Sequence, residues 1–110
     1  MKGWIDLNSI EQFKELLEKS ITETVVVFKH STRCSISSMA QRRLSDLNIE
    51  AYKCAFFYLD LIAHRDVSNY ISESLHETHE SPQILIIKQG VCTYEASHME
   101  ITSRDLVENI

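Results

Sequence analysis

The sequence predicts an α/β fold in which helices cover both faces of a mixed, partly parallel sheet. Short β-branched or aromatic runs alternate with segments whose apolar residues recur at helical spacing, as in chains that build parallel strands. The last two apolar runs are joined only by Gln89-Gly90, which predicts an antiparallel hairpin. With 110 residues, 44% of them hydrophobic, the chain is long enough for one domain with a buried core, and we expect a single domain over residues 1–110.

The first half of the chain alternates two expected strands with two expected helices. A short apolar stretch at 4–7 precedes Ser9, which can cap a helix, with Gln12 as its partner in a capping box. The apolar face of that helix comprises Ile10, Phe13, Leu16 and Leu17. The run Val25–Phe28 is typical of a strand that is covered on both faces. A second helix is expected after Cys34, and its apolar stripe comprises Ile36, Ala40, Leu44 and Leu47.

The second half continues this alternation and then ends in the hairpin and a helix. Residues 56–61 form an expected buried strand, and Asp66 opens a helix whose inward residues are Val67, Tyr70, Ile71 and Leu75. Pro82 precedes the first strand of the hairpin, and Thr102 or Ser103 caps a last helix. The predicted order is therefore β-α-β-α-β-α-β-β-α.

Composition excludes several classes of function. The formal net charge of −5, without a clustered basic face, argues against non-specific binding of nucleic acid. No apolar run approaches the roughly 20 residues that span a bilayer, and the N-terminus lacks a signal-peptide pattern, so we expect a cytoplasmic protein without a membrane partner. Three cysteines at these spacings predict neither a disulfide framework nor a zinc finger.

Cys34 is the candidate nucleophile. It follows a predicted strand and precedes a predicted helix, and ligand sites in such folds lie beyond the carboxyl ends of parallel strands. The unpaired N–H groups at a helix N-terminus stabilise a thiolate, which is the reactive form of cysteine. Arg33, Lys29 and His30 are expected to add a positive field. The alternative is a buried, inert cysteine, since free cysteine is among the most buried residue types.

Ser37 stands where a second cysteine would complete a C-x-x-C motif. A C-x-x-S site cannot resolve a mixed disulfide internally, so a second thiol from solution must break it. This chemistry suits the removal of a small thiol from a protein. The Ser37 hydroxyl could also hydrogen-bond the Cys34 thiolate across one helical turn, or it could be an ordinary serine of a first helical turn.

Three segments together are similar to a known family. KHSTRCSIS at 29–37, RDVSNYI at 65–71 and HESPQ at 79–83 resemble the monothiol bacilliredoxins of the YtxJ-like group, and the resemblance spans essentially the whole chain. It implies a bacterial thioredoxin-like fold with a four- or five-stranded sheet, acting in redox homeostasis. It also implies an enzyme that removes bacillithiol from S-thiolated proteins, with bacillithiol as the thiol co-substrate and no bound cofactor.

The resemblance also implies roles for individual residues. Cys34 falls on the family's nucleophile and Ser37 on the serine of its motif, and Pro82 falls on a loop proline that is cis throughout the thioredoxin superfamily. The Ser81 backbone would then pair with an extended substrate segment. The expected substrate-binding residues are Thr32, Arg33, Ser35, Ser81 and Pro82.

Two points depart from these implications. Many family members carry proline directly after the cysteine, whereas this chain has Ser35, whose extra N–H and hydroxyl could change the redox potential. From the residues alone, Ser81-Pro82 would be trans, because only about 5–6% of X-Pro bonds in folded proteins are cis. The cis prediction therefore depends on the resemblance.

Other candidate residues have simpler interpretations. Cys54 and Cys92 lie at the starts of strands and are expected to pack in the core rather than to resolve a disulfide at Cys34. The segment HETHE at 76–80 has two histidines but no companion cysteines, so we expect a solvated loop and no metal site.

Other thiol-dependent families fit less well. A peroxiredoxin would carry T-x-x-C after a proline, and an iron–sulfur monothiol glutaredoxin would carry C-G-F-S; neither motif is present. Two alternatives remain open from the sequence: a non-catalytic binding module that uses the Pro82 loop, and monothiol exchange with another low-molecular-weight thiol.

Overall fold

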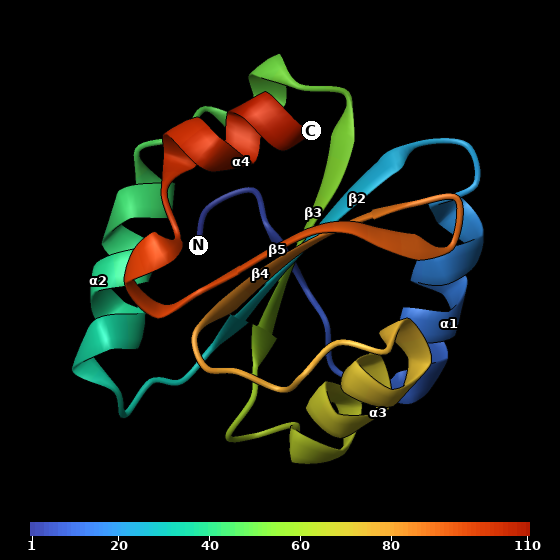
Figure 1. Cartoon of the computed structure of the whole chain (residues 1–110), viewed down its shortest axis with the longest axis horizontal. Coiled ribbons are helices and arrows are strands. Elements are labelled where there is room, and N and C mark those ends of the chain that lie inside the picture. The colour runs from blue at the N-terminus through green and yellow to red at the C-terminus, as the bar shows by residue number, and fades with distance from the viewer.

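Five strands form a mixed sheet between two pairs of helices in the computed structural model, which describes residues 1–110 (Figure 1). The elements are β1 (Ile5–Asp6), α1 (Ile10–Lys19), β2 (Thr24–His30), α2 (Ser35–Ser45), β3 (Cys54–Asp60), α3 (Arg65–Leu75), β4 (Gln83–Lys88), β5 (Val91–Ser97) and α4 (Ser103–Asn109). Short 3₁₀ turns, η1 (Ile49–Ala51) and η2 (His98–Glu100), precede β3 and α4. The predicted element order is confirmed.

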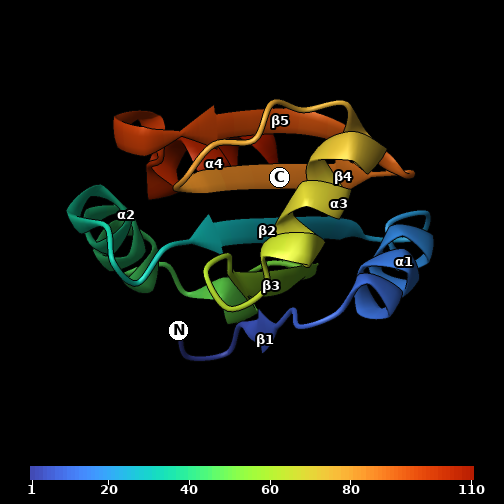
Figure 2. The same cartoon turned by 90° about the horizontal axis from the view of Figure 1, so that it is seen from below.

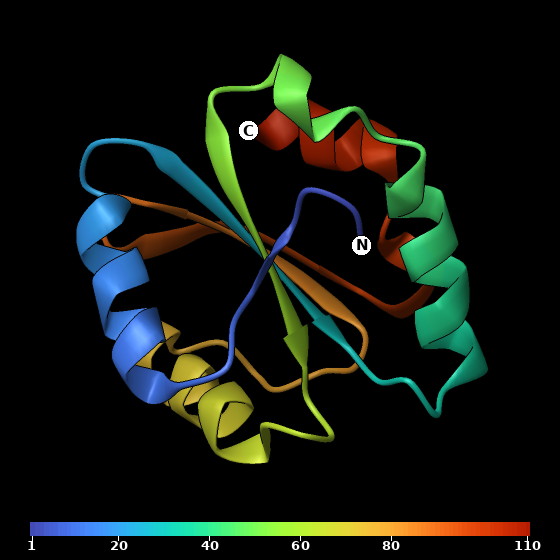
Figure 3. The same ribbon diagram turned by 180° about the vertical axis from the view of Figure 1, so that it is seen from behind.

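The strands lie in the order β1-β3-β2-β4-β5, which Figure 2 shows along the edge of the sheet. β1, β3 and β2 are parallel, whereas β4 runs antiparallel to both β2 and β5. Figure 3 shows β1 at the edge nearest the viewer, in front of β3. The partly parallel sheet closed by a hairpin is therefore confirmed, and it agrees with the thioredoxin-like fold that the resemblance implied.

The two faces of the sheet bury separate apolar clusters. Because successive strand residues point to opposite faces, Val25 and Val27 pack with α1 and α3, whereas Val26 and Phe28 pack with α2 and α4. Figure 1 shows these two helix pairs on opposite sides of the sheet. Complete burial of β2 on both faces explains its continuous β-branched sequence. None of the helices combines the length and the apolar character that crossing a bilayer requires.

The predicted cap of α1 is confirmed, with one difference. The Ser9 hydroxyl accepts a hydrogen bond from the Gln12 N–H at 3.1 Å. The Gln12 side chain, however, accepts from the Asn8 N–H at 2.9 Å and donates to the Asp6 carbonyl at 2.7 Å, rather than returning to Ser9. Gln12 thus ties the start of α1 to the end of β1.

The C-terminal part follows its predicted turn and cap. Gln89 and Gly90 both have positive φ, 51° and 78°, as a two-residue hairpin turn requires. Thr102, rather than Ser103, caps α4, because its hydroxyl accepts from the Asp105 N–H at 3.1 Å.

The predicted apolar stripe of α2 is wrong at its first position. Ile36 is 37% exposed, whereas Ser37 is completely buried together with Ala40 and Leu44. Ile36 (spacings of four and eight) and Ser37 (spacings of three and seven) both fit a face shared with Ala40 and Leu44, and the buried side of α2 is the one that carries Ser37. The buried face of α2 therefore begins with a hydroxyl.

Candidate active site around Cys34

Cys34 is the N-cap residue of α2, at the end of the loop that follows β2. Its backbone is extended, with φ −115° and ψ 126°, and its side chain is half-buried. β2 is flanked by β3 and β4, so this loop leaves the middle of the sheet at its carboxyl edge (Figure 1). The predicted placement of Cys34 at a helix N-terminus is confirmed.

A set of short-range hydrogen bonds fixes the loop before α2. The Cys34 N–H donates to the Ser31 carbonyl at 3.3 Å, and the Arg33 N–H donates to the Ser31 hydroxyl at 3.4 Å. The Ser31 N–H in turn donates to the Ser37 hydroxyl at 3.0 Å. The Cys34 carbonyl accepts from the Ser38 N–H at 3.0 Å, which closes the first turn of the helix. Hydrogen bonds of nearby serines therefore hold the loop that carries the cysteine in this conformation.

Ser37 acts on the loop rather than directly on the sulfur in this structure. Its oxygen lies in the buried face of α2 and accepts from Ser31, and no hydrogen bond joins it to the Cys34 sulfur. A cysteine would be a weaker acceptor at this position. The serine of the C-x-x-S motif thus serves as the acceptor for the Ser31 N–H, a role that the motif alone does not indicate.

Replacing Ser37 by alanine should lower the free energy of unfolding by about 1–3 kcal/mol, because it leaves the buried Ser31 N–H without its acceptor. Urea denaturation measures this change. Ser38→Ala is the matched control: its hydroxyl donates to a Cys34 carbonyl that also accepts from the Ser38 N–H, so we expect a loss below about 1 kcal/mol. Equal losses in the two variants would contradict this role for Ser37.

The Ser81-Pro82 segment lies at the same edge of the sheet as Cys34. Lys29 of β2 pairs with Gln83 of β4 in antiparallel register, which brings the residues after β2 next to those before β4. The Ser81-Pro82 peptide bond is cis, as the resemblance implied. Pro82 is buried, Ser81 is half-buried, and no backbone hydrogen bond within the chain uses the Ser81 N–H or carbonyl. The Ser81 backbone is therefore free to pair with another chain.

The remaining expected substrate-binding residues surround Cys34 on the outside of the molecule. Thr32, Arg33 and Ser35 are all exposed. None of them forms a side-chain hydrogen bond or ion pair with another residue. Their side chains are therefore accessible to a molecule that approaches the sulfur.

The expected contribution of His30 to the positive field is wrong. His30 is 2% exposed, its Nδ1 atom has no hydrogen-bond partner, and its ring lies 5.6 Å from the rings of both Phe28 and Tyr58. Burial is the main cause that lowers the pKa of His30, opposed in part by Asp60. At neutral pH the imidazole is therefore mostly uncharged.

The expected contribution of Lys29 is wrong for a different reason. Lys29 shares the strand face of Val25 and Val27, so its side chain lies on the α3 side of the sheet, opposite α2. The side chain is fully buried, and its ammonium donates to the Ser68 carbonyl at 3.2 Å and to the Ser72 hydroxyl at 3.1 Å. Of the three predicted bases, only Arg33 remains exposed beside the cysteine.

Burial lowers the pKa of Lys29 from 10.5 to about 8, with Glu95 raising it in part. This difference corresponds to about 3 kcal/mol, by which the charged lysine destabilises the fold below pH 8. Between pH 8 and 10.5 the unfolded chain binds more protons at this site than the folded chain. The Lys29 contribution to stability therefore rises with pH across that window.

Lys29→Met should remove this rise. Relative to the variant, the wild type should gain about 3 kcal/mol of unfolding free energy between pH 8 and 10.5, measured by urea denaturation at several pH values. Cysteine and tyrosine titration cancels in the difference between the two proteins. The exposed Lys53→Met is the control and should run parallel to the wild type. A Lys29→Met curve parallel to the wild type would contradict the assignment.

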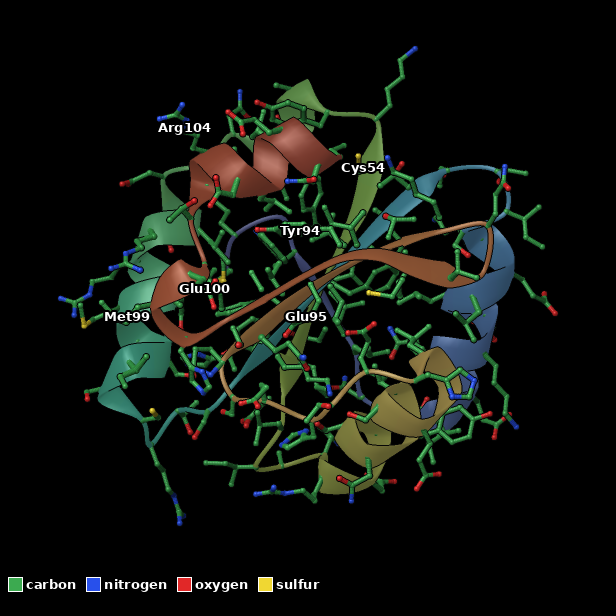
Figure 4. The ribbon with its side chains drawn as sticks, in the orientation of Figure 1. Cys54, Tyr94, Glu95, Met99, Glu100 and Arg104 are labelled. Carbon is green, nitrogen blue, oxygen red and sulfur yellow. The ribbon has the colours of Figure 1, made fainter.

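Cys54 and Cys92 lie at the opposite end of the sheet from Cys34. Cys54 pairs with Thr24 at the start of β2, and Cys92 pairs with Ile87, whose other neighbour is Val25. Figure 4 shows Cys54 at the start of β3. The length of β2 separates them from Cys34 by roughly 20 Å, at about 3.3 Å per residue. A disulfide requires Cα atoms within about 7 Å, so neither thiol can reach Cys34 in this fold.

Both distant thiols pack against the core, as predicted, and both are reduced. Burial raises the pKa of Cys54, and Glu23 adds to this effect. Burial is also the main cause that raises the pKa of Cys92 to about 11, and its thiol donates to the Tyr94 carbonyl at 3.3 Å. These two cysteines are therefore mostly protonated at neutral pH.

The HETHE segment does not gather metal ligands, because no group of three or more His, Cys, Asp or Glu side chains is placed to hold a metal ion. The solvated-loop prediction nevertheless fails for His79. Its Nδ1 atom lies 3.1 Å from the Ser68 hydroxyl, and its ring is half-buried. His76 is exposed and ends α3 in the left-handed conformation.

Comparison with known proteins gives both family and fold. The family model for monothiol bacilliredoxin BrxC matches residues 5–106. One solved protein described as having a thioredoxin fold is 31% identical over 96% of this chain and 91% of its own, with a TM-score of 0.84. Mitochondrial thioredoxin 3 of Saccharomyces cerevisiae is 19% identical, covers 97% of this chain and 92% of its own, and has a TM-score of 0.76. Schistosoma mansoni thioredoxin is also 19% identical, covers 97% and 98%, and has a TM-score of 0.75.

Proposed function

Because the chain belongs to the monothiol bacilliredoxin family, we propose that it is a thiol-disulfide oxidoreductase that removes bacillithiol from S-bacillithiolated proteins. One observation carries the proposal: one half-buried cysteine stands at a helix N-terminus, and both other thiols of the chain lie about 20 Å away. Such a site can exchange disulfides only with thiols supplied by other molecules.

In the first step, the Cys34 thiolate attacks the bacillithiol sulfur of the mixed disulfide. A bond forms between Cys34 and that sulfur, the original disulfide breaks, and the target protein leaves as a thiolate that takes a proton from water. Attack is directed to the small-thiol sulfur because the target protein shields its own. The product is a reduced target and a bacillithiol adduct on Cys34.

In the second step, the thiolate of a free bacillithiol attacks the adduct. A bond forms between the two bacillithiol sulfurs, and Cys34 leaves as a thiolate ready for another cycle. The net reaction converts the mixed disulfide and one free bacillithiol into a protein thiol and a bacillithiol disulfide, so only the free bacillithiol is oxidised. No cofactor is needed, because bacillithiol is the co-substrate.

The surroundings of Cys34 support substrate binding in this cycle. The free Ser81 N–H and carbonyl can pair with an extended segment of the target, a one-residue strand addition that keeps its disulfide near Cys34. Exposed Arg33, with Thr32 and Ser35, can bind the polar and acidic groups of the small thiol. Within this proposal the protein acts in the bacterial cytoplasm, where it maintains protein thiols in the reduced state.

A dethiolation assay tests the proposal. A model protein bearing one bacillithiol disulfide is mixed with a catalytic amount of the chain and with bacillithiol or glutathione at equal concentration. We expect multiple turnovers with bacillithiol, at a rate that rises with its concentration, and slower turnover with glutathione. Faster turnover with glutathione would assign the site to another low-molecular-weight thiol. A rate equal to that of the free thiol alone would favour a non-catalytic binding module.

A further inference from the structure

A partly buried polar cluster, formed by Lys29, Ser68, Ser72 and His79, lies on the sheet face opposite Cys34. The Lys29 ammonium donates to the Ser68 carbonyl at 3.2 Å and the Ser72 hydroxyl at 3.1 Å, and it lies 3.5 Å from the His79 Nδ1 atom. Three acceptors thus match the three N–H groups of one ammonium. The cluster joins β2, α3 and the loop between α3 and β4.

The contacts define the protonation of His79. Its Nδ1 atom faces both the Lys29 ammonium and the Ser68 hydroxyl at 3.1 Å, which are donors, so Nδ1 is the acceptor and Nε2 carries the proton. Burial, together with the positive charges of Lys29 and Arg65, lowers the pKa of His79, and Glu80 opposes this in part. A neutral imidazole is therefore held against a charged lysine.

A second buried side chain, on the same face of the sheet as Lys29, also holds this loop. Gln83 is completely buried, and its amide nitrogen donates to the Thr78 carbonyl at 3.0 Å and to the Glu95 carboxylate at 2.8 Å. Glu95 extends from β5 (Figure 4). The backbone at 78–79 is thus tied to the sheet by Gln83 and to β2 and α3 through His79.

The tied residues come immediately before the substrate-binding edge. Thr78 and His79 precede Ser81 by three and two residues, and the intervening Glu80 pairs with His98 at 3.4 Å on the surface. The Ser81 backbone itself forms no hydrogen bond within the chain, whereas the Pro82 carbonyl accepts from the His98 N–H at 3.1 Å. Its position beside Cys34 therefore depends on its anchored neighbours.

We propose that Lys29 and His79 are positioning residues, which hold the Ser81-Pro82 segment in place for binding the target protein. The inference takes its substrate from the proposed function. The anchoring of the loop by these contacts does not depend on that function. Neither side chain lies on the α2 side of the sheet, so their effect falls on recognition of the target and not on the reactivity of the sulfur.

Two His79 variants provide a matched pair. His79→Leu removes the acceptor, whereas His79→Asn keeps a carbonyl oxygen near the position of Nδ1. With a bacillithiolated protein as substrate, His79→Leu should raise KM about tenfold, the loss of roughly one hydrogen bond to the loop, and leave kcat within about twofold. His79→Asn should recover most of the KM. Lys29→Met should raise KM in the same direction.

Two further readouts separate positioning from a general loss of structure. Alkylation of Cys34 by iodoacetamide should stay within about twofold of wild type in all three variants. Proteolytic cleavage within residues 76–81 should become about tenfold faster in His79→Leu, while cleavage within α1 should not change. Thr102→Ala, which removes the cap of α4, is the control that weakens the fold without touching this loop.

The outcomes are distinguishable. Unchanged KM and an unchanged rate of cleavage within 76–81 in a folded His79→Leu would overturn the inference. Equal losses in kcat and in Cys34 alkylation would also overturn it. If His79→Leu does not fold, Lys29→Met and His79→Asn decide by the same readouts. If the wild type shows no dethiolation at all, the proposed function fails, and the proteolysis rates alone still test the anchoring.

Discussion

Cys34→Ser should reduce the dethiolation rate to that of free bacillithiol alone. A serine hydroxyl is not ionised near neutral pH and cannot form the mixed disulfide on which both steps depend. No second thiol can replace it, because Cys54 and Cys92 lie about 20 Å away at the other end of the sheet. The rate is followed by release of the reduced target protein.

The other two cysteines provide the controls. Cys54→Ala and Cys92→Ala should keep turnover within about twofold of wild type, because neither thiol can approach the Cys34 sulfur. Each variant should lose some stability, since both side chains pack against the core. A folded Cys92→Ala that no longer turns over would reveal a distant resolving thiol and contradict this division of roles.

Ser37→Cys should change the end product of the reaction from a small-thiol adduct to an internal disulfide. Residues 34 and 37 are three positions apart at the start of a helix, and they therefore share one side of its first turn. The new thiolate can attack the adduct on Cys34 and release bacillithiol, which leaves Cys34 joined to residue 37. Intact mass measurement after one turnover should show a mass lower by two hydrogens and no adduct.

The same substitution should also cost stability in the reduced protein, because the Ser37 oxygen accepts the Ser31 N–H and sulfur is a weaker acceptor. Ser45→Cys is the matched control. It adds a thiol in the last turn of the same helix, about 12 Å further along at about 1.5 Å per residue, and should keep the adduct on Cys34. A persistent adduct in Ser37→Cys would show that the buried side of α2 cannot turn toward the sulfur.

The elements of the fold could be predicted because their signals are local. The Val25–Phe28 run, the Ser9 cap and the Gln89-Gly90 turn each depend on a few neighbouring residues, and all three are present in the structure. The stripe of α2 was placed wrongly because Ile36 is apolar and Ser37 is not. Helical spacing from Ala40 and Leu44 fits both residues, and only the packing of α2 on the sheet shows that Ser37 is the buried one.

The site was predicted only in part. The position of Cys34 follows from a strand that ends just before a helix, which is local information. Strand alternation places Lys29 on the same face of the sheet as Val25 and Val27, away from Cys34. This alternation is visible in the sequence and excludes Lys29 from the positive field around the sulfur.

The hydrogen-bond partners of Lys29 could not be predicted from the local sequence. Ser68, Ser72 and His79 are 39 to 50 residues away, and only the packing of α3 on the sheet brings them together. The cis bond at Pro82 was also beyond the residues alone, since most X-Pro bonds are trans. For that bond the resemblance to the family supplied the prediction.

The measurement that tests the monothiol mechanism most directly is the intact mass of the wild-type protein after a single turnover. The chain is mixed with one equivalent of a bacillithiolated protein without free bacillithiol, quenched with acid and digested to locate the modification. The mechanism predicts one bacillithiol adduct, on Cys34, that persists until free bacillithiol is added. A disulfide between Cys34 and Cys54 or Cys92, with no adduct, would contradict it.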